Sequence, residues 1–224
     1  MSDEIVDFDQ YVDQYEELLK GQLSFFNSSR DYFSAYKIHL LKQNLETAPK
    51  RILDFGCGIG LNLPHLIQAF PQAEIYATDI SHKSLAYVSA HYPTVKILKN
   101  PQELADFDLI FLAGVMHHIP PRQRLQTMKE IKNLLTSSGT VCIFEHNPFN
   151  PVTRKIVSEC PFDKGVVLLS QNNLRSLMEE SNIKPYKAHY CLFFPDTLRF
   201  LRPAERLLRW LPLGGQHFVM GRNG

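Results

Sequence analysis

The sequence predicts a doubly wound α/β fold, in which helices cover both faces of a mostly parallel sheet. Two observations support this prediction. Short apolar runs alternate with segments of helical periodicity over residues 51–145. The first apolar run leads into a glycine-rich turn, and the second run ends on an acid, Asp79. Because parallel strands need crossover connections, which are usually helices, this alternation favours a parallel sheet.

The core elements can be placed in order along the chain. Pro64 suits the first turn of a helix, where its missing N–H is not needed, and Ser81 suits a helix N-cap. We therefore expect helices at residues 61–70, 81–91 and 121–135, the last of which stops at Ser137-Ser138-Gly139. The expected strands are residues 51–55, 74–78, 95–98, 107–113 and 140–144.

The two ends of the chain depart from this alternation. Residues 1–46 carry aromatic and apolar side chains at helical spacing, which predicts a helical cap. After the core we expect helices at 152–160 and 171–181, and then a sixth strand at 183–194. A seventh strand at 216–220 would follow an insertion of about twenty residues, which is longer than an ordinary hairpin loop.

Size and composition limit the classes of protein to consider. A chain of 224 residues suits a single domain, residues 1–224, with a substantial core. Its hydrophobic content of 44% is ordinary for a globular protein. The net charge of +1 lacks the strong basic excess of a general nucleic-acid binder, so we expect no nucleic-acid partner.

The sequence also predicts a cytoplasmic protein. The first ten residues are acidic and lack the apolar core of a signal peptide, and no apolar run approaches membrane-spanning length. The four cysteines are scattered without the spacing of a metal site, so we expect buried, reduced thiols.

The glycine turn indicates the kind of ligand. Gly56, Gly58 and Gly60 allow close approach of backbone to a ligand, but Leu61 stands where a dinucleotide fingerprint has its third glycine. Asp54, two residues before the turn, would repel a diphosphate and attract a cation. These residues therefore favour a nucleoside-like ligand that lacks phosphate and carries positive charge.

Three segments resemble the motifs of one family, the class I S-adenosylmethionine (SAM)-dependent methyltransferases. Residues 54–60, Asp-Phe-Gly-Cys-Gly-Ile-Gly, resemble its motif I, and Asp79-Ile80 resembles its acidic partner. Residues 107–120 resemble its motif IV. The resemblance is of the small-molecule, type 11/12-like kind. It implies a Rossmann-like sheet of seven strands with the last antiparallel, a SAM-binding core at 51–145 and a substrate side at 146–224.

The resemblance also implies roles at the methionine end of SAM. The backbone of Gly56, Cys57 and Gly58 would meet the carboxylate, and Asp54 would bind the ammonium. Ala113 would offer its carbonyl group to the same ligand. The alternative for the glycine turn, a flavodoxin-like protein, is disfavoured by the joint presence of Asp54 and Asp79.

At the nucleoside end, Asp79 would accept the ribose hydroxyls and Ile80 would lie against adenine. Asn100 would accept a hydrogen bond from the adenine amine. The alternatives left open are that Asp79 caps a helix and that Asn100 is a loop residue before a proline.

Further residues are candidates for closing the cofactor site. Tyr11 or Tyr15 could cover the sulfonium by a cation–π contact, and Lys37 could meet the ligand carboxylate. His118 would pack beside the methionine moiety, unless it is a structural histidine bonded to loop backbone. The neighbouring pair His117-His118 lacks a third ligand at the right spacing, so we expect no metal.

Glu145 and His146 are candidates for acid–base chemistry, because they follow the fifth strand where it opens onto the substrate. A histidine with a pKa near its reference value could take a proton from the acceptor. Both residues could instead have capping or loop roles. A base is not obligatory, because in-line transfer from a sulfonium depends largely on alignment and a dry pocket.

Residues 196–211 are expected to shape the substrate side. Four arginines recur at helical spacing opposite leucines: Arg199, Arg202, Arg206 and Arg209 against Leu201, Leu208 and Leu211. Such a segment could cover a lipid-like substrate or contact an anionic membrane, although an ordinary docked surface helix is the alternative. Pro203 should end or kink it.

The expected activity is methyl transfer from SAM to oxygen or nitrogen of a small molecule, with S-adenosylhomocysteine (SAH) as product. Lipid-linked and glycan-linked acceptors are favoured by the insertion. No (D/N)PPY tetrapeptide follows the fourth strand, which disfavours planar amides and nucleobases. The competing functions are an NAD-dependent oxidoreductase and a non-catalytic partner subunit of the same fold.

Overall fold

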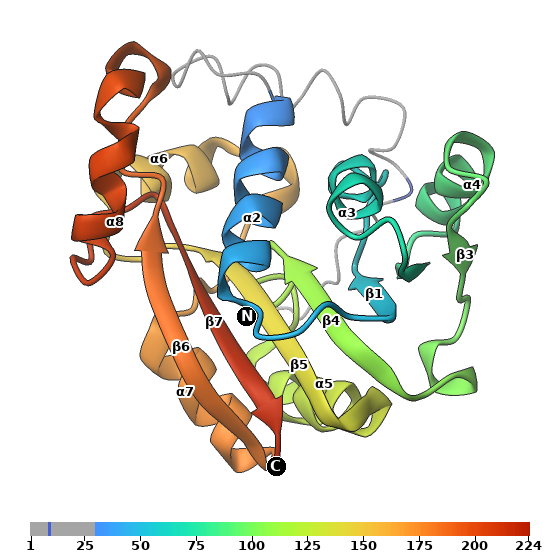
Figure 1. The fold of residues 1–224 in the computed structure, drawn as a ribbon. Coiled ribbons are helices and arrows are strands. Elements are labelled where there is room, and N and C mark those ends of the chain that lie inside the picture. Colours follow the sequence, from blue (N-terminus) through green and yellow to red (C-terminus); the bar gives the residue numbers. More distant parts are fainter. Residues whose placement is uncertain (1–8, 10–29) are drawn as a thin grey trace.

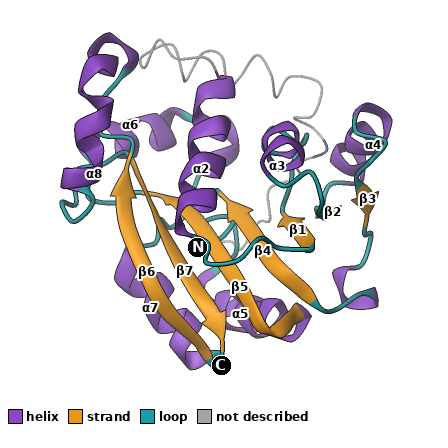
Figure 2. Cartoon of the chain, in the orientation of Figure 1, coloured by secondary structure: helices purple, strands orange, loops and turns teal. Residues whose placement is uncertain are grey.

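In the computed structural model, which describes Asp9 and residues 30–224, seven strands form one sheet with the order β3-β2-β1-β4-β5-β7-β6 (Figure 1). β7 pairs antiparallel with both β5 and β6, and the other pairings are parallel. Helices cover both faces of the sheet (Figure 2). The predicted seven-stranded, doubly wound α/β fold with an antiparallel last strand is therefore confirmed.

The strands and helices lie close to their predicted positions. The strands are β1 (Arg51–Phe55), β2 (Glu74–Thr78), β3 (Lys96–Ile97), β4 (Phe107–Ala113), β5 (Leu135–His146), β6 (Ile183–Cys191) and β7 (Gln216–Asn223). The helices are α2 (Arg30–Asn44), α3 (Leu63–Ala69), α4 (His82–His91), α5 (Pro121–Leu134), α6 (Pro151–Glu159), α7 (Gln171–Glu180) and α8 (Glu205–Leu208). Three 3-10 segments are η3 (Pro101–Glu103), η4 (Pro161–Asp163) and η5 (Asp196–Ala204).

Side-chain caps explain where several helices begin. The Ser81 hydroxyl accepts a hydrogen bond from the Ser84 amide at the start of α4. Ser170 and Asn173 form a reciprocal capping box at the start of α7. Such caps satisfy amide groups that have no partner inside the helix.

The core is divided between the two faces of the sheet, and β4 shows how. Leu109 and Phe111 face one cluster, to which α2, α3 and α4 contribute. Ile110 and Leu112 face the other cluster, to which α5 and α7 contribute. All four side chains are fully buried. Because helices cover both faces of the sheet, the sequence of β4 is a continuous run of apolar residues and does not alternate between apolar and polar.

β5 begins earlier than predicted. Ser137, Ser138 and Gly139 were expected to separate a helix from a strand, but β5 already starts at Leu135. The pairing with β4 shifts register between Phe107 and Leu109, which marks a bulge. A Cβ atom at Gly139 would lie 2.7 Å from the Phe107 carbonyl oxygen, so this bulge requires glycine. The residues that were expected to form a turn, Ser137 to Gly139, therefore lie in β5 beside a bulge.

The insertion before β7 is not the single helix that its arginine spacing suggests. It consists of η5 and the short helix α8, and the backbone of Leu198 departs from helical geometry (φ −110°, ψ 23°). Pro203 does not end the segment, because η5 continues to Ala204. The interruption comes at Leu198 instead, where sequence periodicity gives no signal.

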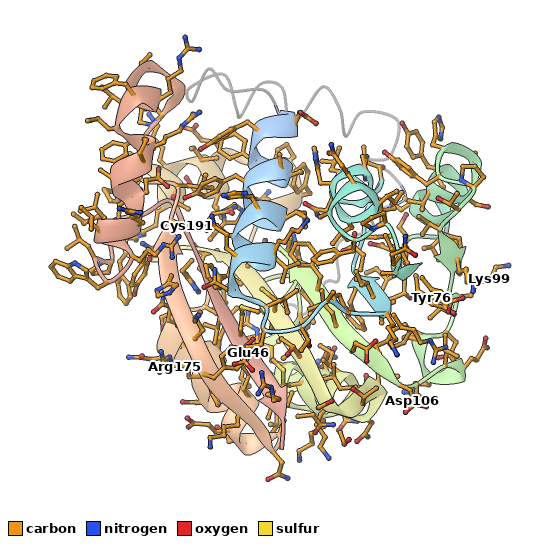
Figure 3. All side chains as sticks on the ribbon, viewed as in Figure 1. Glu46, Tyr76, Lys99, Asp106, Arg175 and Cys191 are labelled. Carbon is orange, nitrogen blue, oxygen red and sulfur yellow. The ribbon has the colours of Figure 1, made fainter. Side chains whose placement is uncertain are left out.

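The candidate ligand site lies at the end of the sheet where the parallel strands have their carboxyl termini, which we call the carboxyl edge. Cys191, at the carboxyl end of β6, and Asp106, just before β4, lie at opposite edges in Figure 3. The order of strands reverses between β1 and β4, and ligands of such sheets bind at the carboxyl edge beside this reversal. All four cysteines are buried thiols that form no disulfide bond with one another. None of the described helices is long and apolar enough to span a membrane.

Candidate active site

The turn between β1 and α3 lies at the carboxyl edge and needs its glycines. Gly56, Gly58 and Gly60 have φ values of 72°, 52° and 81°. A Cβ atom at Gly56 would lie 2.6 Å from Val115 Cγ2, whereas a Cβ at Gly58 would meet nothing within 4 Å. Gly56 is therefore required for packing, and Gly58 borders open space. The amides of Gly56 and Cys57 both donate to the Thr78 carbonyl oxygen, at 2.8 and 3.0 Å.

Asp79 joins the glycine turn to the helix that follows β2. Its Oδ2 accepts from the Gly58 amide and its Oδ1 from the Ser81 amide, both at 2.8 Å. Burial raises the pKa of this carboxyl group, while the two amide bonds oppose the shift. Asp79 therefore supports the turn, but the N-cap of α4 is Ser81 and not Asp79. Ile80 beside it is 71% exposed, which is unusual for a residue of its size at a strand end.

Asp54 ends deep in the same edge, with 1% of its surface exposed. Its Oδ2 atom has no hydrogen-bond partner among the described residues. Burial raises the pKa of the Asp54 carboxyl group to about 7, although the positive charge of Lys37 opposes this shift. A buried carboxylate without a donor is costly. A ligand group that brings a positive charge and N–H donors would remove that cost.

Lys37 approaches the site from α2. It lies close enough to Asp54, Glu145 and Cys191 for their charges to act on it, although burial lowers its pKa overall. The helix α2 lies in front of the sheet near its carboxyl edge (Figure 1). The predicted lid residues Tyr11 and Tyr15 lie outside the described residues.

The remaining cofactor candidates have more ordinary environments. Asn100 is exposed, and its Oδ1 accepts from the Gln102 amide at 3.1 Å at the start of η3. Ala113 ends β4 at the reversal of strand order. The Cys57 side chain belongs to the core, so only its backbone faces the turn.

Glu145 anchors the loop that follows β4. Its carboxylate accepts from the amides of Val115 (3.2 Å) and Met116 (2.8 Å) and is 2.6 Å from His117 Nδ1. Burial alone would raise the pKa of Glu145, but His117 lowers it to about 2. With 1% exposure it does not open onto a substrate, contrary to the sequence expectation. Its place indicates a positioning role.

His146 lies beside this anchor, with its ring centroid 5.2 Å from that of His117. Burial lowers the pKa of His146 to about 4, and the nearby His117 adds to the effect. This value differs from the near-reference pKa that the sequence suggested. His146 is therefore a neutral imidazole at pH 7, able to accept a proton but only weakly basic.

Asp163 of η4 also reaches the histidines, and the sequence did not reveal it. Its Oδ1 lies 3.5 Å from His117 Nε2 and 3.3 Å from His118 Nε2. Arg124 is a second residue that sequence reasoning missed. It donates to the carbonyl oxygens of Ile119 (2.8 Å) and Val167 (2.6 Å), which ties the β4 loop to the segment after η4. Neither residue belongs to a local motif, so only the fold brings them to the site.

Comparison with known proteins agrees with this geometry. Residues 53–141 match the family model described as a methyltransferase domain. The chain is 30% identical to a malonyl-[acyl-carrier protein] O-methyltransferase of Legionella pneumophila over 49% of this chain and 38% of that protein. It is 25% identical to a trans-aconitate 2-methyltransferase of Rhodopseudomonas palustris over 56% and 50% of the two chains. The chain thus spans half or less of the length of these curated relatives.

Two solved structures share the fold over nearly the whole chain. A possible histamine N-methyltransferase from Thermotoga maritima superposes with a TM-score of 0.68 at 16% identity, covering 97% of this chain and 98% of that one. A SAM-dependent methyltransferase from Archaeoglobus fulgidus gives a TM-score of 0.67 at 16% identity, covering 88% and 96%.

The strand order, the glycine turn at the order reversal and the acid at the tip of β2 are the arrangement of a doubly wound α/β domain whose ligand site lies at this edge. The match over residues 53–141, which include the glycine turn and the tip of β2, makes this part of the chain similar to the methyltransferase-domain family.

Proposed function

We propose that this chain is a SAM-dependent methyltransferase that acts on oxygen or nitrogen of a small molecule. The observation that carries the proposal is the buried Asp54 carboxylate, whose Oδ2 atom has no donor among the described residues and which precedes the glycine turn at the reversal of strand order. A dinucleotide would bring two phosphate charges to this place, whereas the ammonium of SAM would bring a cation.

The residues of the site fit the two ends of SAM. Asp54 would hold the ammonium, and Lys37 would neutralise the carboxylate. Asp79 can accept the ribose hydroxyls without giving up its bonds to the Gly58 and Ser81 amides, because each carboxylate oxygen has two lone pairs. The exposed Ile80 offers an apolar surface for adenine.

Bound SAM supplies a sulfonium methyl group, to which the acceptor atom forms a bond as the carbon–sulfur bond breaks, leaving SAH. The protein's own contribution is alignment and removal of the acceptor proton. His146 is the nearest candidate to take that proton, as a neutral imidazole at the end of β5. Glu145 acts through His117 and the β4 loop, as a positioning residue.

The acceptor side is formed next to the insertion. The Asn147 side chain, one residue beyond β5, donates to the carbonyl oxygens of Pro212 (3.1 Å) and Gly214 (2.7 Å), which fixes the end of the insertion beside the site. Phe200, Leu207 and Trp210 are 70%, 68% and 74% exposed.

We infer that the acceptor is lipid-linked and that residues 196–211 rest on an anionic membrane surface. The support is the combination of exposed apolar side chains with the arginines between them. The name of the trans-aconitate relative supports a small acceptor, and that of the malonyl-[acyl-carrier protein] O-methyltransferase supports an oxygen nucleophile.

Thermal-shift measurements with SAH and NAD separate the proposed function from its competitors. Stabilisation by SAH and not by NAD is expected. Stabilisation by NAD alone would favour an oxidoreductase, and no response to either would favour a non-catalytic subunit. Incubation of cell extracts with the protein and methyl-labelled SAM, followed by mass spectrometry of labelled products, would then identify the acceptor.

A further inference from the structure

We propose that His117, His118 and Asp163 bind a divalent first-row transition-metal ion, such as Zn²⁺, beside the position of the methyl acceptor. The three residues come from the loop after β4 and from η4, which the fold brings together at the carboxyl edge. No metal was expected from the sequence, because Asp163 lies far from the histidines along the chain.

The distances fit a shared metal. The Asp163 Oδ1 atom is 3.5 Å from His117 Nε2 and 3.3 Å from His118 Nε2. The three ligand atoms all lie within 4.8 Å of one another. Tetrahedral zinc with bonds of about 2.0–2.1 Å holds neighbouring ligand atoms about 3.3–3.4 Å apart. The two distances from Asp163 Oδ1 to the histidine nitrogens are therefore close to those between neighbouring ligands of a bound zinc ion.

The tautomer of His117 points to a cation in the same place. Glu145 accepts at 2.6 Å from Nδ1, which places the proton of a neutral imidazole there and leaves the Nε2 lone pair directed at Asp163. A lone pair and a carboxylate repel each other unless a cation lies between them. A histidine that gives one N–H to a carboxylate and its other nitrogen to the metal is a recurrent arrangement of metal sites.

A proton on His117 Nε2 is the alternative cation, and the same two carboxylates do raise the pKa of His117 to about 9 against the effect of burial. However, a charge-assisted N–H···O bond is about 2.7–2.9 Å long. At 3.5 Å, His117 Nε2 makes no hydrogen bond to a described residue. The distance between His117 Nε2 and Asp163 Oδ1 is too long for a shared proton and fits a metal ion bound by both atoms.

The ligands are held in place by their surroundings. Glu145 is fixed by two backbone amides, Arg124 donates to the His117 carbonyl oxygen at 3.4 Å, and the Asp163 amide donates to the Cys160 carbonyl oxygen at 3.2 Å. The side chains of His117 and Asp163 are 1% and 7% exposed, but that of His118 is 16% exposed. The cluster can therefore be reached from the His118 side.

Three protein ligands leave a tetrahedral metal one open position. That position would take an anionic oxygen of the acceptor, a carboxylate or an ionised hydroxyl, and hold it near His146. This consequence rests on the proposed methyl-transfer function, whereas metal binding itself does not.

Co²⁺ titration of the full chain after chelator treatment tests the site, with isothermal calorimetry and visible absorption as readouts. One Co²⁺ per chain is expected, with the d–d absorption of a low-symmetry site. His118→Ala and Asp163→Ala should each weaken binding at least tenfold. His39→Ala, which removes an exposed histidine of α2, is the matched control and should bind like the wild type.

Circular dichroism of each variant checks that it folds, and Asp163→Asn replaces Asp163→Ala where the latter does not. Failure of the folded wild type to bind Co²⁺ would overturn the proposal, as would unchanged affinity in folded variants at both positions. SAH calorimetry on the same samples keeps the two proposals apart. Co²⁺ binding without SAH binding counts against the methyltransferase proposal alone, and the reverse counts against the metal alone.

Discussion

At the residue scale, single buried charges decide what this site can hold. The Oδ2 atom of the buried Asp54 has no donor among the described residues, whereas the buried Glu145 carboxylate has three donors. The Asp54 carboxylate therefore lowers the stability of the ligand-free protein and suits a ligand site, whereas the Glu145 carboxylate holds the loop after β4 in place. Sequence reasoning identified both acids but could not separate these roles, because the amides of Val115 and Met116 that satisfy Glu145 reach it only through the fold.

Asp54→Asn should stabilise the ligand-free protein. Burial raises the pKa of Asp54 from 3.8 to about 7. Below pH 3.8 the carboxyl group is neutral in both the folded and the unfolded protein, and the fold is not penalised. As the pH rises to 7 the group ionises readily only in the unfolded protein, so this part of the free energy of unfolding is lost. The gain from asparagine should therefore grow between pH 4 and pH 7 and level off above, reaching about 1–4 kcal/mol. Chemical denaturation across this pH range measures it. Equal stability of the two proteins at pH 8 would contradict a buried, donor-free carboxylate.

His146→Ala tests the proton-acceptor role. Because His146 lies at the end of β5 and not in the glycine turn, its loss should slow turnover by about 10²-fold or more while SAH affinity stays within about twofold. Turnover requires the acceptor found with labelled SAM. Full activity of the variant would remove the base role and leave alignment as the source of the rate.

At the scale of elements, the fold was predictable where the signal is local and not where it depends on distant partners. The strands β1, β2 and β4 match their predicted bounds, because burial on both faces gives continuous apolar runs. The bulge at Gly139 was not predictable, since it depends on the Phe107 carbonyl group of another strand. The insertion was predicted as a helix that Pro203 ends or kinks, and it is a 3-10 segment followed by a short helix. It is held by contacts to residues outside it.

Glu205 supplies those contacts. It is 3% exposed, its Oε1 accepts from the amides of Phe193 (3.0 Å) and Phe194 (3.2 Å), and its Oε2 accepts from the Tyr36 hydroxyl. Glu205→Ala should cost about 1–3 kcal/mol, because two part-buried amides lose their acceptor. Tyr36→Phe, which removes one donor of the three, should cost less. Urea denaturation compares the two, and the opposite ranking would contradict Glu205 as the anchor of α8.

The same element carries the predicted membrane contact. Wild-type protein should bind anionic phospholipid vesicles more tightly than neutral ones, and the binding should weaken with salt. Arg206→Glu reverses one exposed charge on the insertion and should weaken binding about tenfold or more, since each basic residue near the surface contributes about 1 kcal/mol. Vesicle co-sedimentation measures this.

Arg175→Glu is the matched control, because Arg175 is exposed on α7, far from the insertion (Figure 3). It should bind vesicles like the wild type. Equal loss of binding in both variants would show that the effect comes from net charge and not from residues 196–211. Failure of the wild-type protein to bind anionic vesicles would contradict the membrane proposal.

At the scale of the whole molecule, one edge of one sheet gathers every residue to which a function is given. The glycine turn, Asp54 and Asp79 were found from the sequence, because their spacing follows from one strand–turn–helix unit. Asp163 and Arg124 were not, because they reach the site through tertiary packing. Sequence therefore predicted the cofactor half of the site better than the acceptor half.

Calorimetric titration of SAH into the wild type and into Asp79→Ala tests the central claim most directly. Asp79 is the residue that joins the glycine turn to the tip of β2, with 2.8 Å bonds to both Gly58 and Ser81. We predict one SAH per wild-type chain and an affinity loss of at least about 100-fold in Asp79→Ala, where the ribose acceptor and the support of the turn are both removed. Absence of SAH binding by the folded wild type, or equal affinity of the two proteins, would contradict the account.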